Sequence, residues 1–168
     1  MNQQRESNTV EHYTPHWVID VAAHMLSWID LDPATSEKAN TIVKANKIYT
    51  QETDGLVQEW KGNVFCNPPG QPSKWFRKAV EQYKLDNLQN LFFVVYSIDR
   101  LPTILKVCKQ NEINPLVIIP HKRIEYLNSE TLEPQTQPLH GSAFIYFGRI
   151  DITPSLWSDK YTILRTKS

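Results

Sequence analysis

The residues best suited to chemistry lie in one short turn, Asn67 to Gly70, which directly follows an apolar run. Two consecutive prolines, Pro68 and Pro69, fix two φ angles and remove two backbone donors, so the turn is stiff. The Asn67 side-chain oxygen and the following carbonyl are neutral, fixed acceptors. Such acceptors, aimed at the two hydrogens of an aromatic amine, favour its pyramidal, nucleophilic form. An ordinary proline-rich connection is the alternative.

Strands and helices that alternate along the chain must position this turn. Thr14, as N-cap, and Pro15 predict the start of a helix, and apolar spacings of three and four extend it to about Ser27. Further helices are predicted over residues 73–84, with a serine N-cap, and over about 100–110. The segment "PATSEKAN" is predicted to be a loop, with one helical turn as an alternative. Strands are predicted at "WIDLD", "KIYT", "NVFC", "NLFFVVY", "PLVIIP" and "GSAFIYFG", with "YTILR" as an edge strand.

This alternation predicts an α/β fold with a largely parallel central sheet and helices on both faces. In such sheets, ligands bind at the carboxyl ends of the strands. Asp32 and Asn67 each fall at the end of a predicted strand, so we expect both in one cleft on that edge. We expect a flexible tail over residues 1–11, a single domain over 12–168, and a long loop at about 121–140.

Composition narrows the function classes. The chain has 18 basic and 18 acidic residues, so a nucleic-acid contact must come from a local basic face. Cys66 and Cys108 lie far apart in sequence, which suits a reducing compartment. No apolar run reaches the ~20 residues that span a bilayer, so a cytoplasmic protein is expected. His12 and His16 lack a third ligand, so no metal is expected.

Six blocks in order, "EHYTPHWVID", "IDLDPAT", "ANKIYTQETDGLVQEW", "NVFCNPPG", "PHKRIEYLN" and "GSAFIYFG", resemble the small phage-type DNA N-6-adenine methyltransferase family. The resemblance covers about residues 13–148. It implies a Rossmann-like enzyme that uses S-adenosylmethionine to methylate the exocyclic amine of adenine in DNA, in the cytoplasm of a bacterium or phage-infected host cell.

The resemblance also implies roles for individual residues. The Asn-Pro-Pro motif would hold the target amine, and "YTP" would contact the cofactor. A carboxylate at the end of "IDLD" would pair with the cofactor ammonium or accept from its ribose hydroxyls. The Asp in "TDGL" would lie near the cofactor adenine. These assignments give Asn67, Pro68 and Pro69 as catalytic residues, and Tyr13, Thr14, Pro15, Asp30, Asp32, Pro33 and Asp54 as cofactor-binding residues.

Gly70 departs from the family pattern, in which an aromatic residue stacks on the flipped base. Such stacking is worth roughly 1 to 3 kcal/mol per base, and glycine supplies none of it. Three alternatives stay open: Trp75 or Phe76 stacks instead, the base is held by other means, or the site no longer methylates adenine.

The implied substrate is duplex DNA with its target adenine extruded, at a cost of a few kcal/mol. We expect basic residues near the motif to bind phosphates and offset this cost. For Lys74, Arg77 and Lys78, which follow the motif directly, an ordinary solvated helix face is the alternative. The expected phosphate contacts are Lys74, Arg77, Lys78, Lys122 and Arg123. The loop at about 121–140 is expected to be either the recognition element or a disordered segment.

Two other functions fit the same residues. An inactive descendant would keep the fold and bind nucleic acid or a protein partner, with Gly70 as its mark. A methyltransferase acting on RNA or protein is also possible, because the turn can hold any planar nitrogen. Cofactor binding and the nature of the methylated product distinguish these alternatives.

Overall fold

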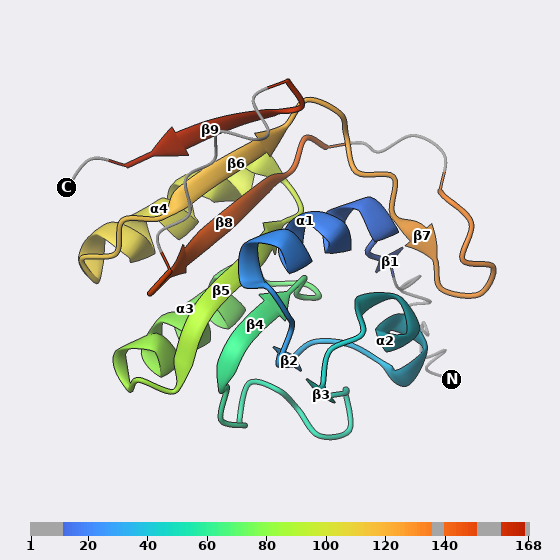
Figure 1. Ribbon diagram of the computed structural model, residues 1–168, viewed down its shortest axis with the longest axis horizontal. Helices are drawn as coiled ribbons and strands as arrows, with labels where there is room; N and C mark the ends of the chain where they lie inside the picture. Colours follow the sequence, from blue (N-terminus) through green and yellow to red (C-terminus); the bar gives the residue numbers. More distant parts are fainter. Residues whose placement is uncertain (1–11, 136–139, 151–158, 167–168) are drawn as a thin grey trace, which may run out of the picture.

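The computed structural model describes residues 12–135, 140–150 and 159–166. Its main feature is a seven-stranded sheet with the strand order β3-β2-β4-β5-β8-β6-β9 (Figure 1). The strands are β2 (Leu31–Asp32), β3 (Lys47–Ile48), β4 (Gly62–Cys66), β5 (Leu88–Val95), β6 (Leu116–Pro120), β8 (Ala143–Gly148) and β9 (Tyr161–Arg165). The segment "YTILR" forms the edge strand β9, as predicted.

The prediction of a largely parallel sheet is wrong for half of its pairings. Strands β3, β2, β4 and β5 pair in parallel, whereas β8 is antiparallel to both β5 and β6, and β9 is antiparallel to β6. An apolar run such as "AFIYF" shows that a strand is buried on both faces, but it carries no signal for direction. Since β5 and β6 are both antiparallel to β8, they run the same way, and their carboxyl ends lie at the same edge.

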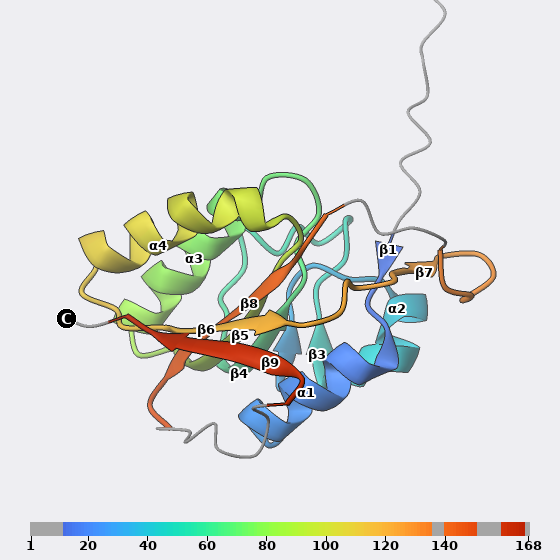
Figure 2. The same cartoon turned by 90° about the horizontal axis from the view of Figure 1, so that it is seen from above.

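Helices cover both faces of the sheet, as predicted (Figure 2). On one face, α1 (His16–Leu26) and α2 (Glu37–Val43) share a core with Phe65, Phe92 and Phe144. On the other face, α3 (Pro72–Lys84) and α4 (Leu101–Gln110) share a core with alternate residues of the same strands. A 3-10 turn, Ile98–Arg100, leads into α4.

Two predicted helix starts need correction, and one segment predicted as a loop with a possible helical turn is more helical than expected. Helix α1 is capped by Pro15 rather than Thr14, and α3 begins at Pro72, after Gln71, rather than after a serine cap. The segment predicted as a loop after β2 contains α2. Ser36 Oγ accepts from Ala39 N at 3.2 Å and so caps that helix.

The segment predicted as a long loop at 121–140 carries a strand. Strand β7 (Leu127–Asn128) pairs antiparallel with β1 (His12–Tyr13), and both lie together at one side of the molecule (Figure 1). Residues 136–139 of this loop, and the predicted tail over residues 1–11, lie outside the described residues.

Candidate active site

Asp32 and Asn67 lie at the same edge of the sheet. Asp32 ends β2, and Asn67 directly follows β4, which is the parallel neighbour of β2. The paired residues Leu31 and Val64 pack into the core on the α3 side. Because side chains alternate along a strand, Asp32 and Asn67 are both directed to the opposite side, which α1 covers.

Thr14 holds the Asn67 amide. Asn67 Nδ2 donates to Thr14 Oγ1 at 2.9 Å, and Thr14 is only 5% exposed. The amide oxygen, Oδ1, makes no hydrogen bond with any residue in the described part of the chain. Pro68 is half-buried and Pro69 is exposed. The turn therefore presents a fixed, neutral acceptor that is available to a ligand.

Asp32 is a buried carboxylate, 3% exposed. Its Oδ1 accepts from the backbone N–H of Ala34 at 3.1 Å. Burial raises the pKa of Asp32 to about 7, although the Ala34 N–H and the Thr35 side chain lower it in part. Within the described ranges no basic side chain pairs with Asp32. A carboxylate with this environment suits a ligand that brings a positive charge or hydroxyl donors.

Two segments close on the loop that follows Asp32. The Tyr13 hydroxyl lies 3.1 Å from Ser36 Oγ, so the "YTP" segment spans this loop and reaches Asn67 through its next residue. On the other side, Gly55 packs so closely on Pro33 that an added Cβ would lie 1.9 Å from the Pro33 carbonyl oxygen.

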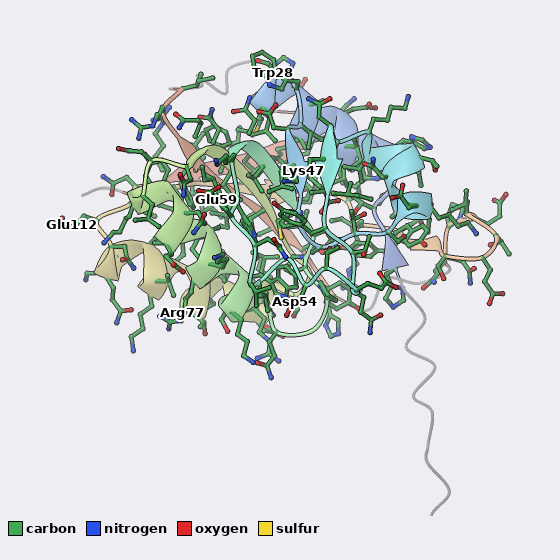
Figure 3. The ribbon with its side chains drawn as sticks, turned by 90° about the horizontal axis from the view of Figure 1, so that it is seen from below. Trp28, Lys47, Asp54, Glu59, Arg77 and Glu112 are labelled. Atoms are coloured by element: carbon green, nitrogen blue, oxygen red, sulfur yellow. The ribbon has the colours of Figure 1, made fainter. Side chains whose placement is uncertain are left out.

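Asp54 is the exposed neighbour of that close contact. It has a left-handed backbone, with φ 49°, and its Oδ1 accepts from Leu56 N at 3.1 Å. Figure 3 shows Asp54 toward the side of the molecule where Arg77 lies, away from Trp28 at the end of α1. Asp54 is thus near the loop after Asp32, but its carboxylate already caps its own turn.

Asp30 does not join this cluster. It lies before β2, where its Oδ2 accepts from Asn63 N at 2.8 Å and its Oδ1 from Trp28 Nε1 at 3.0 Å. Close packing of Gly62 against the same carboxylate completes this arrangement. These contacts give Asp30 a structural role in holding the start of β4 beside β2, at the opposite edge from Asp32.

The expected phosphate contacts fall into two groups. Lys74 and Arg77 are exposed on the first turns of α3, directly after the Asn67 turn, and Lys78 is half-buried. Lys122 and Arg123 are exposed just beyond β6, at the same edge as Asn67. Lys122 Nζ lies 4.4 Å from the centre of the Trp17 ring, so this cation packs on α1.

Trp75 and Phe76, the expected substitutes for an aromatic at Gly70, pack against other aromatic rings of the protein. Gly70 is exposed, has φ +65°, and would have open space around an added Cβ. Phe76 is fully buried against Phe93. The half-buried Trp75 ring stacks on Trp60, with ring centres 6.1 Å apart.

Sequence reasoning missed two residues near the site. Ser36 joins Tyr13 to the loop after Asp32, and an N-cap serine before an acidic first turn was the signal for it. Tyr96 directly follows β5, so the rule that selected Asn67 also places Tyr96 at the ligand-binding edge.

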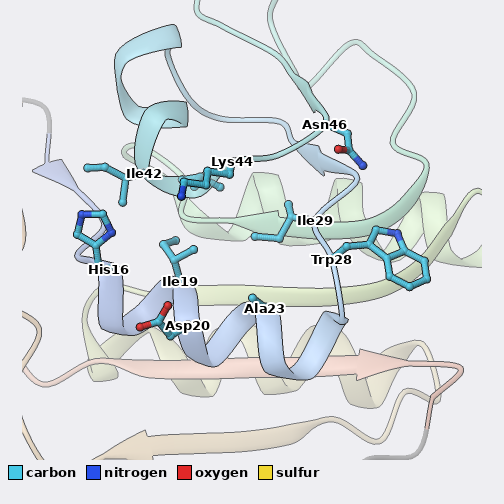
Figure 4. A pocket seen from close by; sticks show the side chains of 10 residues that line it. His16, Ile19, Asp20, Ala23, Trp28, Ile29, Ile42, Lys44 and Asn46 are labelled. Carbon is cyan, nitrogen blue, oxygen red and sulfur yellow. The ribbon is translucent and has the colours of Figure 1, made fainter.

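A separate pocket of about 270 Å³ lies between α1 and α2 (Figure 4). His16, Ile19 and Asp20 of α1 face Ile42 and Lys44 across it. None of the residues expected to bind the cofactor or the target base lines this pocket. It is therefore distinct from the edge that carries Asp32 and Asn67.

The fold is of the α/β class, with Asp32 and Asn67 at the carboxyl ends of neighbouring parallel strands, the edge at which such sheets bind ligands. The chain belongs to the DNA N-6-adenine-methyltransferase (Dam) family, whose sequence model matches residues 3–163. It is therefore an enzyme that methylates adenine in DNA. No curated protein and no solved structure matches the chain.

Among residues 12–135, 140–150 and 159–166, there is no group of three or more His, Cys, Asp or Glu side chains placed to hold a metal ion. In the same ranges, no helix has the length and apolar character needed to cross a bilayer.

Proposed function

We propose that the chain takes its methyl group from S-adenosylmethionine, bound beside Asp32, and transfers it to an adenine held by the Asn67 turn. The observation that carries this proposal is the Asn67 amide, which Thr14 fixes through its nitrogen while its oxygen stays available. When bound, S-adenosylmethionine supplies an electrophilic methyl group.

The residues around Asp32 fit this cofactor. Asp32 is buried without a cationic partner in the described part of the chain, and the cofactor carries both an ammonium group and ribose hydroxyls. Tyr13 contacts the loop after Asp32 through Ser36, and Thr14 and Pro15 follow Tyr13 in the same segment. Pro33 lies within the loop and packs against Gly55. We assign Asp54, beside Gly55, to the outer part of the cofactor. Asp30 is outside this set, because its carboxylate accepts from Trp28 and Asn63.

The Asn67 turn orients the target amine. Asn67 Oδ1 and the Pro68 carbonyl oxygen accept hydrogen bonds from the two amine hydrogens, which directs the nitrogen lone pair toward the methyl group. Pro69 stiffens the turn. This chemistry depends on alignment more than on a strongly basic side chain, so a positioned acceptor pair is sufficient.

The proposed function also includes the extent of the domain and the way in which it holds DNA. Residues 12–168 form one Rossmann-like methyltransferase domain of a cytoplasmic enzyme. Duplex DNA lies across the edge with its target adenine extruded toward Asn67. Phosphates contact Lys74, Arg77 and Lys78 on one side of the turn and Lys122 and Arg123 on the other.

The experiment compares Asn67→Ala with the wild type, using radiolabelled S-adenosylmethionine and unmethylated DNA, RNA or protein as separate acceptors. Wild-type label should enter DNA as N6-methyladenine. The variant should lose at least tenfold in turnover while its cofactor affinity, measured by calorimetry, stays unchanged. Asn114→Ala, an exposed change beyond α4, is the matched control. Unchanged transfer by Asn67→Ala would remove Asn67 from the mechanism.

A further inference from the structure

The turn that holds the target amine has no aromatic side chain of its own. Gly70 is exposed, and a Cβ built there would have no atom within 4 Å. An adenine drawn to Asn67 therefore has open space on that side. Because stacking is worth roughly 1 to 3 kcal/mol per base, its absence would weaken the hold on an extruded adenine.

Tyr96 lies at the corresponding place on the next strand. Strand β4 pairs in parallel with β5, and the last residue pair in that register is Cys66 with Phe93. Pro69 and Tyr96 are each three residues beyond that pair. Tyr96 follows β5, and the Asn67 turn follows β4. Because these strands are neighbours, their backbones lie about 4.8 Å apart.

Tyr96 also belongs to the same side of the sheet as Asn67. Val95 packs into the core on the α3 side, whereas Tyr126, which contacts the Tyr96 ring, packs into the core on the α1 side. By the same alternation, Asn67 is directed to the α1 side, where it meets Thr14. The Asn67 and Tyr96 side chains are thus directed to the same side of the sheet.

The Tyr96 ring is held in place yet partly open. It is 43% exposed, and its ring centre lies 5.5 Å from that of Tyr126 and 5.6 Å from that of His140. The Tyr96 carbonyl oxygen accepts from Ser142 Oγ at 2.8 Å. A ring fixed in this way loses little conformational entropy when a base stacks on it.

The residues that contact the Tyr96 ring are linked to the Asn67 turn through the segment His12 to Thr14. The Tyr126 ring lies 6.2 Å from that of His12, in β1. Two residues later in the same segment, Thr14 holds the Asn67 amide. One short segment therefore contacts both the amide of Asn67 and the aromatic group that carries Tyr96.

We propose that Tyr96 stacks on the target adenine and supplies the aromatic contact that Gly70 lacks. This inference rests on the proposed function of the Asn67 turn. Tyr126 and His140 are positioning residues, because they contact and orient the Tyr96 ring rather than the base.

The test uses the full chain, S-adenosylmethionine and unmethylated DNA, and compares Tyr96→Ala, Tyr96→Leu and Tyr96→Phe. Tyr96→Ala and Tyr96→Leu should lower kcat/KM for DNA by about 5- to 150-fold, the range that base stacking gives. Tyr96→Phe keeps the ring and should stay within twofold of wild type. Cofactor affinity should be the same for all four proteins. Leu85→Ala, a change of an exposed apolar side chain directly after α3, is the control.

The possible outcomes separate this inference from the function on which it rests. Wild-type protein that places no methyl group on DNA would overturn both. Normal wild-type transfer with an unaffected Tyr96→Ala would overturn the stacking role alone. A loss in Tyr96→Phe as large as that in Tyr96→Ala would overturn it as well, because the hydroxyl and not the ring would then matter. Tyr96→Leu preserves apolar packing on Tyr126, so it answers the question if Tyr96→Ala is poorly folded.

Discussion

The Asn67 amide donates to the hydroxyl of Thr14, a residue 53 positions earlier in the chain, at 2.9 Å. This bond joins the segment before α1 to the turn after β4. It selects which end of the amide is available for a ligand. With the nitrogen engaged by Thr14, the oxygen is left as an acceptor, which is the group that a target amine requires.

Thr14→Val should lower turnover. Valine keeps the shape of threonine but cannot accept from Asn67 Nδ2, so the amide loses the contact that fixes its orientation. A hydrogen bond of this kind is worth about 1 kcal/mol, which predicts a reduction in kcat of about fivefold to tenfold. Steady-state methylation of DNA measures this effect. Thr14→Ser restores the acceptor and should recover most of the rate, and equal rates for the valine and serine variants would contradict the prediction.

Asp32→Asn should separate cofactor binding from stability. The change removes a carboxylate that is buried without a cation in the described residues, so the folded protein should be as stable as wild type or more stable. Affinity for S-adenosylmethionine should fall at least tenfold, because the ammonium or ribose partner is weakened. Calorimetric titration and thermal unfolding of the same samples measure the two effects. Lower stability with unchanged affinity would assign Asp32 a purely structural role.

The pKa of Asp32 also predicts how stability depends on pH. Burial raises this pKa from 3.8 to about 7, so between these values the folded chain binds more protons at Asp32 than the unfolded chain does. The contribution of Asp32 is therefore fully present below pH 4 and is lost as pH rises through 7, in total about 4 kcal/mol. Urea unfolding of wild type and Asp32→Asn across this range isolates the contribution. A stability difference that does not change with pH would rule out the raised pKa.

Cofactor affinity should show the opposite dependence. Binding of a positive group favours the ionised carboxylate, so affinity should rise with pH up to about 7 and then level off. Below pH 7, binding should release a proton, which calorimetry in two buffers of different ionisation enthalpy detects. Asp32→Asn should show neither the rise nor the proton release from this group.

The sequence predicted the strands and helices that carry a continuous apolar run or a clear apolar periodicity and missed short strands that carry neither. Segments such as "NLFFVVY" and "LPTILKVCKQ" form β5 and α4 as expected. Strands β1 and β7 have two residues each, too few for any periodic pattern, and only their mutual pairing defines them. The direction of β8 was missed for a related reason, since burial on both faces does not depend on direction.

The candidate site shows the same division. Asn67 and Asp32 could be found because each stands at the end of a predicted strand, where α/β sheets bind ligands. The sequence predicts Thr14 as a helix cap and, by resemblance, as a cofactor contact, but it offers no sign of a hydrogen-bond partner 53 residues away. Asp30 shares the local pattern of Asp32, but the structure uses its carboxylate to hold Asn63 and Trp28.

Gly55→Ala should disturb the loop after Asp32. The added Cβ would lie 1.9 Å from the Pro33 carbonyl oxygen, so one of the two loops must shift. We expect a loss of stability of about 1 to 3 kcal/mol and a weaker affinity for S-adenosylmethionine. Gly70→Ala is the matched control, because its Cβ meets no atom and only its positive φ of 65° opposes the change, at about 1 kcal/mol. Equal stability and cofactor affinity in Gly55→Ala and wild type would show that the contact with Pro33 is easily relieved.

Lys74→Ala and Arg77→Ala should weaken DNA binding in a manner that depends on salt. Both side chains are exposed on the first turns of α3, and a lost phosphate contact reduces the slope of log K against log salt by about 0.9. Fluorescence anisotropy with a labelled duplex at several salt concentrations measures this slope. Lys106→Ala and Lys109→Ala, two exposed changes on α4, are the controls and should leave it unchanged. If the α3 and α4 variants change the slope equally, a diffuse positive field rather than contacts beside Asn67 accounts for binding.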